Sequence, residues 1–192
     1  MSIIPAEIPA AVLPRRRQLL FGTVFVSIAV AMYQLALVGL YLQERSARSN
    51  VWFAEHTIPL TQPNMQLSAL GLSVVFVQWA VWAIARNQRG QAYFALGCTL
   101  LMGFAFLNQT TFLWTEIGLP MTNVEGPLFY AVTASHFAII VAAMVFLLVT
   151  AFRTLAGSNS AEHPEGVSAA ALFWHVSVAL YTVVWLAVYI MK

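Results

Sequence analysis

The feature of this sequence that most constrains its fold is a pair of long apolar runs near the C-terminal end, residues 128–152 and 167–191. Each run holds about 25 residues, which as an α-helix rises roughly 37 Å and can cross the hydrocarbon core of a bilayer. One histidine lies inside each run, His136 in the first and His175 in the second. A polar connection over residues 153–166 joins them. The pattern predicts two antiparallel transmembrane helices.

The composition extends this prediction to the rest of the chain. Of the 192 residues, 60% are hydrophobic and only 8% are charged, whereas about a quarter of the residues in a soluble domain are charged. So few charges could not cover a water-facing surface, and we predict an integral membrane protein. Three further apolar runs cover residues 19–42, 65–85 and 91–114. We therefore expect an all-α bundle of five transmembrane helices over residues 19–192, preceded by a cytoplasmic tail over residues 1–18.

Lysine and arginine residues flank the apolar runs and predict the orientation of the bundle, because cytoplasmic loops carry an excess of them. With the N-terminus inside, six basic residues lie on the inner side and three on the outer side. We therefore expect the N-terminus inside and the C-terminus outside. The basic residues form no patch, so the net charge of +2 gives no indication of nucleic-acid binding. The inner six are Arg15, Arg16, Arg17, Arg86, Arg89 and Arg153, and the outer three are Arg45, Arg48 and Lys192.

The two histidines inside the last runs are candidates for a functional site, because an ionisable residue at membrane depth is usually functional. The helices that carry His136 and His175 enter the membrane from opposite faces. The depths of the two histidines should therefore differ by roughly 6 Å in a hydrocarbon core about 30 Å thick. Two axial ligands of one haem need nearly the same depth. A small b-type cytochrome that uses both histidines is therefore an alternative that the spacing does not favour. We expect His136, Trp174 and His175 to pack and hydrogen-bond within the bundle or against a partner subunit.

Polar groups at membrane depth are amides and hydroxyls rather than carboxylates. The chain has no aspartate, and no glutamate lies in the middle of an apolar run. Because a proton relay usually needs carboxylates at depth, we do not expect a pump or a proton channel, and a free-standing transporter is a less favoured alternative. Asn108 and Gln109 begin a polar cluster that continues to Thr111. Amides in lipid are costly unless paired, so this cluster should face another helix, in this chain or in a partner.

Motifs of a catalytic or metal centre are missing from the sequence. The single cysteine, Cys98, lies in an apolar run, so the chain can form neither an internal disulfide nor a thiolate cluster. The sequence has no glycine-rich phosphate loop, nucleophile elbow or metal-ligand spacing. The residues alone therefore predict a membrane protein without catalytic residues or a metal site of its own. Such a pattern is typical of an accessory subunit.

The last two runs resemble subunit III of the haem–copper terminal oxidases, the cytochrome c oxidase subunit 3 family. One helix of that family reads like F-F-x-x-T-G-x-H-G-x-H-V. The corresponding stretch here reads FYAVTASHFAII, with Thr133 and His136 in the matching places. The last helix of the family reads like Y-W-H-F-V-D-V-V-W-L-x-L-Y, and Trp174 and His175 match its Trp-His pair. Five spans with the N-terminus inside also fit a short form of the family that lacks its first two helices.

The chain departs from the family pattern at buried carboxylates. The aspartate of the last helix is replaced by Val178, and the glutamate expected in the third run is Phe112. Where the family has a glutamate near the middle of the first run, this chain has Tyr33 and Gln34. The resemblance therefore implies the architecture of the family more strongly than a role in proton uptake.

The resemblance implies a non-catalytic subunit III of a respiratory oxidase, which stabilises the catalytic subunit that reduces O2 and translocates protons. It implies subunit I and subunit II as partners, with haem and copper bound by the partner catalytic subunit and phospholipid held between helices. The expected location is the bacterial cytoplasmic membrane. A subunit-III-like companion of a nitric oxide reductase is an alternative, because the substrate chemistry lies in another chain. The structural or partner-facing side chains are Thr133, His136, Trp174, His175, Asn108 and Gln109.

Overall fold

The computed structural model describes residues 17–50, 52–53, 58–157, 159–160 and 164–191, and all of the regular structure in these residues is helical. Five helices are long and apolar enough to cross a membrane, so the predicted all-α fold with five spans is confirmed. Most of the predicted tail, with Arg15 and Arg16, and the terminal Lys192 lie outside the described residues. The helices are α1 (Gln18–Ala47), α2 (Thr61–Ala85), α3 (Arg89–Ile117), α4 (Glu125–Leu155) and α5 (Glu165–Val184), which continues as the π-helix η1 (Trp185–Ile190).

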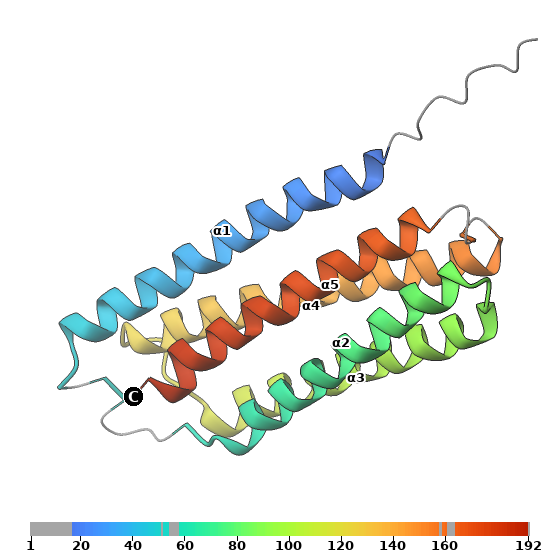
Figure 1. Ribbon diagram of the computed structural model, residues 1–192. Coiled ribbons are helices and arrows are strands. Elements are labelled where there is room, and N and C mark those ends of the chain that lie inside the picture. Colours follow the sequence, from blue (N-terminus) through green and yellow to red (C-terminus); the bar gives the residue numbers. More distant parts are fainter. Residues whose placement is uncertain (1–16, 51, 54–57, 158, 161–163, 192) are drawn as a thin grey trace, which may run out of the picture.

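Helices α4 and α5 lie side by side in the middle of the bundle (Figure 1). Helix α1 packs on one side of them, and the α2–α3 hairpin packs on the other. Hydrogen bonds join the start of α1 to α5 and the end of α1 to η1. The Leu20 N–H donates to Glu165 Oε1 at 3.0 Å, and Arg45 Nη1 donates to the Ala187 carbonyl at 3.2 Å. The start of α1 and the end of η1 therefore lie at opposite ends of the bundle.

The connection between α2 and α3 is short, and the two helices are antiparallel neighbours as the sequence predicts. The Ala83 carbonyl at the end of α2 accepts the N–H of Arg86 at 3.2 Å and the N–H of Gln88 at 2.9 Å. These bonds satisfy a carbonyl that the helix itself leaves unpaired. Small side chains let the two backbones approach closely, which favours helix association in lipid. Fully buried alanines of the two helices are Ala80, Ala83, Ala92 and Ala95.

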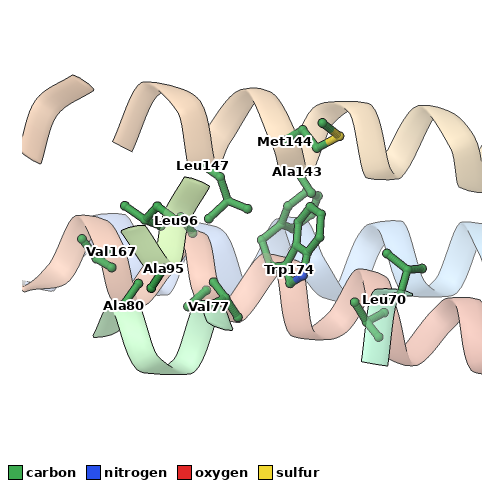
Figure 2. Close-up of a cluster of buried hydrophobic side chains, with 14 of the residues drawn as sticks. Leu70, Val77, Ala80, Ala95, Leu96, Ala143, Met144, Leu147, Val167 and Trp174 are labelled. Atoms are coloured by element: carbon green, nitrogen blue, oxygen red, sulfur yellow. The ribbon is translucent and has the colours of Figure 1, made fainter. Parts of the chain in front are cut away.

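The larger of two hydrophobic clusters joins α2, α3, α4 and α5 (Figure 2). The fully buried ring of Trp174 lies inside it, next to Met144. A Cβ atom on Gly103 of α3 would lie 2.8 Å from the Met144 sulfur and 3.0 Å from the Trp174 ring. Glycine at this position therefore makes room for the indole. The second cluster lies towards the opposite end, where Tyr41 of α1 and Phe129 of α4 pack with η1.

Candidate functional site

Trp174 on α5 forms a hydrogen bond to α2 inside the bundle. Its indole Nε1–H donates to Ser73 Oγ at 2.8 Å, and Ser73 in turn donates to the Leu70 carbonyl at 2.5 Å. Trp174 is fully buried, and its ring packs next to Gly103 of α3 and Met144 of α4. Trp174 thus contacts three neighbouring helices at once. A large ring with a paired polar edge is suited to fixing their spacing.

His175, the next residue, is half-buried and turns towards a different part of α2. Its Nε2 lies 3.2 Å from Gln78 Oε1. Because an amide oxygen only accepts, the imidazole nitrogen donates in this pair. The structure therefore gives His175 a partner on another helix of the same chain.

His136 on α4 is almost completely buried, and its ring packs between two aromatic rings. The Phe106 ring centroid lies 5.7 Å away, nearly perpendicular, and the Tyr181 ring centroid lies 5.3 Å away. Neither imidazole nitrogen has a hydrogen-bond partner in the described part of the chain, so the expected hydrogen bond within the bundle is not found. The reason is that Tyr181 directs its hydroxyl to Gln66 of α2 instead.

The positions of the two histidines do not suit a shared haem. His136 packs against Tyr181, which follows His175 by six residues on α5, a rise of about 9 Å along the helix. His175 meanwhile faces Gln78 on α2. The two imidazoles therefore differ in depth and face different helices. Within the described residues, no three side chains of His, Cys, Asp or Glu come together as a candidate metal site.

A layer of polar side chains links the helices at membrane depth. Gln66 Nε2 on α2 donates to Thr110 Oγ1 on α3 at 3.0 Å, and Gln66 Oε1 accepts from the Tyr181 hydroxyl on α5. On the other side of the bundle, Gln34 Nε2 on α1 donates to the Val132 carbonyl at 3.1 Å, and Gln34 Oε1 accepts from Ser135 Oγ at 2.8 Å. Both glutamines are buried, and their amides are paired entirely within this chain.

Sequence reasoning noticed Gln34 but missed Gln66 and Tyr181 as members of this layer. Gln66 lies near the start of a predicted span, where an exposed amide would be unremarkable. The signal available was a polar side chain within an apolar run, since such groups usually pair with another helix. That signal does not say which helix provides the partner.

Thr133 links α4 to α3. Its Oγ1 accepts the indole N–H of Trp114 at 3.1 Å and donates to the Phe129 carbonyl at 2.8 Å. Trp114 also packs against the ring of Phe137 on α4. Thr133 is therefore a bridging residue between neighbouring helices of this chain.

The polar cluster on α3 is divided between two faces of the helix. Thr110 is buried and bonded to Gln66, whereas Asn108 and Thr111 are exposed. Thr111 donates to backbone carbonyls of its own helix. The side-chain amide of Asn108, which is exposed, and that of Gln109, which is half-buried, form no hydrogen bond with the described residues. The expected partner helix of these two amides is therefore not found among the described helices.

A cavity of about 730 Å³ opens at the end of the bundle where α1 and η1 finish. Aromatic and aliphatic side chains form most of its wall, including Tyr41, Trp52 and Tyr189. Arg45 also lines it, and one of its amino groups holds the Ala187 carbonyl. The cavity therefore combines an apolar wall with one guanidinium group.

Comparison with known proteins finds a matching family and several similar proteins. The family model for cytochrome c oxidase subunit III matches residues 19–192. Cytochrome c oxidase subunit 3 of Carassius auratus is 31% identical over 133 residues, which is 69% of this chain and 49% of that protein. The subunit 3 of Gadus morhua is 34% identical over 133 residues, with the same shares, and that of Struthio camelus is 30% identical over 132 residues, 68% of this chain and 51% of that protein.

The chain spans about half the length of these curated relatives. Within that span, the match includes the Thr133 and Trp174 regions that the structure shows bridging helices. The family model matches all five helices, and these relatives are 30–34% identical to the chain, which identifies the fold as that of the family. This chain belongs to the cytochrome c oxidase subunit III family.

Proposed function

We propose that the chain acts as a non-catalytic subunit III of a haem–copper respiratory oxidase, where it stabilises the catalytic subunit that reduces O2 and translocates protons. The observation that carries this proposal is the family match over residues 19–192. The contacts of Thr133, Trp174 and His175 support a structural role, because each side chain bonds to a neighbouring helix. Residues placed in this way hold a bundle in one shape that a partner can recognise.

The proposed partners are subunit I, which would bind the haem and copper, and subunit II. We do not propose a direct role for this chain in proton uptake. Val178 and Phe112 stand where the resemblance leads us to expect carboxylates. At the corresponding place on α1, the Gln34 amide bonds to Val132 and Ser135 and has a structural role. The first-span carboxylate of the family is thus replaced by a helix-to-helix bond.

We propose the bacterial cytoplasmic membrane as the location, with the N-terminus inside. The distribution of described basic residues supports the orientation, since the end of the bundle that holds the start of α1 carries more of them than the other end. The end with the start of α1 has Arg17, Arg86, Arg89 and Arg153, and the other end has Arg45 and Arg48.

A phospholipid is the proposed ligand of this chain itself. The cavity at the end of α1 and η1 offers an apolar wall for an acyl chain and the guanidinium of Arg45 for a phosphate. Arginine suits phosphate oxygens because its donors form a planar fork. Lipid extraction of the purified protein followed by mass spectrometry checks this part, and a protein that carries no lipid in mild detergent would contradict it.

The function is tested by tagging the chain, extracting it from native membranes in mild detergent and recording a reduced-minus-oxidised visible spectrum. We expect a haem band together with a large co-purifying subunit and copper. Membranes from cells that lack this chain should contain a catalytic subunit that loses its activity faster than in cells that have it. A chain that purifies alone and without pigment would overturn the proposal.

A further inference from the structure

Helix α3 presents a continuous exposed face that no described helix of this chain covers. Its residues follow alternating spacings of four and three, and every one of them is exposed. That spacing keeps side chains on one side of a helix and is the pattern by which membrane helices pack at small crossing angles. We call this face the α3 seam. It consists of Gly97, Leu101, Phe104, Asn108, Thr111 and Thr115.

Spacing alone does not show whether the α3 seam faces a partner helix or lipid. The depth of Asn108 favours a partner helix. Asn108 precedes Trp114 by six residues, about 9 Å along the helix. Tryptophan side chains favour the membrane interface, and Trp114 lies near the end of α3. Asn108 therefore lies within the hydrocarbon region, where an unpaired amide is costly. Its neighbour Gln109 is likewise unpaired among the described residues and only half-buried.

Other polar and exposed positions in this chain show that the arrangement at Asn108 is unusual. The buried amides of Gln34 and Gln66 are paired with other helices of the bundle. On α4, exposed side chains in the middle of the helix, such as Val141 and Val145, are apolar and suit contact with lipid. In the described chain the buried amides of Gln34 and Gln66 are thus paired, and the exposed side chains in the middle of α4 are apolar. The two adjacent amides of Asn108 and Gln109 on α3, in contrast, have no hydrogen-bond partner among the described residues.

We propose that the α3 seam is a docking surface for a transmembrane helix of a different subunit, and that this helix carries a hydrogen-bonding side chain at the depth of Asn108. An amide both donates and accepts, so Asn108 and Gln109 can each bond to a hydroxyl, amide or carboxylate of the partner. Gly97 leaves room for close approach at the opposite end of the seam. The occupant is assigned to another subunit because the related proteins are named as subunits of an oxidase, so this assignment rests on the proposed function.

The experiment places a photo-reactive benzoylphenylalanine at Phe104 of the full chain in native membranes and identifies the cross-linked product by mass spectrometry. A second chain carries the probe at Tyr33, the exposed aromatic residue of α1 whose hydroxyl also lacks a partner among the described residues. We expect position 104 to cross-link to a transmembrane segment of another protein. Cross-links from position 104 only to lipid, or only to a second copy of this chain, would overturn the proposal.

Substitution of Asn108 tests the polar part of the docking surface. Asn108→Leu should lower the cross-linking yield at position 104 by about threefold to tenfold, because the lost interhelical hydrogen bonds are modest in membranes. The matched control, Val145→Leu on the lipid-facing side of α4, should leave that yield unchanged. The stability of the isolated chain in detergent should be the same for both variants, since Asn108 bonds to no described residue. An unchanged yield with Asn108→Leu would contradict the assignment.

The outcomes also separate this inference from the proposed function. A haem-containing complex that cross-links from position 33 and not from position 104 keeps the proposed function and overturns the α3 seam. A cross-link from position 104 to a protein of a complex without haem keeps the docking surface and overturns the proposed function.

Discussion

Two pairs of polar residues show how differently this chain treats amides at membrane depth. Gln34 and Gln66 face inward, and both ends of each amide are bonded to neighbouring helices. Asn108 and Gln109 lie on one side of α3 and form no such bonds in the described chain. The amide groups of Gln34 and Gln66 therefore stabilise the fold, whereas those of Asn108 and Gln109 require a partner outside the described chain. The difference teaches that polarity within a span marks an interface, while the surroundings decide whose interface it is.

The largest expected contrast between the interior and the α3 seam comes from aromatic residues. Trp174→Ala should lower the free energy of unfolding by about 3–5 kcal/mol, because it removes a fully buried ring. Phe104→Ala on the seam, where 64% of the side chain is exposed, should change it by no more than about 0.5 kcal/mol. Titration of the full chain with SDS, followed by helical circular dichroism, measures both. Equal losses would show that the seam is buried in the isolated chain.

A matched pair of amides tests the same contrast at the level of hydrogen bonds. Gln66→Leu should lower the free energy of unfolding by about 1–3 kcal/mol, because it removes the two buried bonds that the Gln66 amide makes to Tyr181 and Thr110. Gln109→Leu should have an effect below about 0.5 kcal/mol in the isolated chain. The SDS titration again provides the measurement. A loss for Gln109→Leu as large as that for Gln66→Leu would place Gln109 inside the bundle network.

A small effect with the opposite sign is expected for His136. Its two ring nitrogens are buried without partners in the described chain, so His136→Leu should raise the free energy of unfolding by about 1 kcal/mol. His175→Leu removes a bond to Gln78 and should lower it by about 0.6 kcal/mol. Both values are measured on the isolated chain by the same titration. Destabilisation by His136→Leu would indicate a buried water that bonds to the imidazole.

The sequence predicts the helices of this protein well, because the length and polarity of an apolar run determine whether it can span a membrane. It does not predict which face a polar residue presents. Asn108 and Thr110 are two positions apart, which is more than half a turn of a helix, so Asn108 faces the outside of the bundle and Thr110 faces its interior. The sequence treats them as one cluster.

The partner of each polar side chain is equally hidden from the sequence. His136 has no bond because Tyr181 directs its hydroxyl to Gln66, and these three residues come from three different helices. Such a choice depends on how the helices rotate against one another. The close packing of Trp174 beside Gly103 is one contact that restricts this rotation, and it joins residues of two helices that are far apart in the sequence.

The position of α1 has a consequence for the biosynthesis of the protein. The residues that pair with Gln34 belong to α4, and the bonds at the two ends of α1 reach α5 and η1. Chains grow at about 5–20 residues per second, so α1 is complete several seconds before the ribosome has made α4. During that interval the Gln34 amide has none of its final partners. We therefore expect the translocation machinery to shelter α1 until the last hairpin enters the membrane.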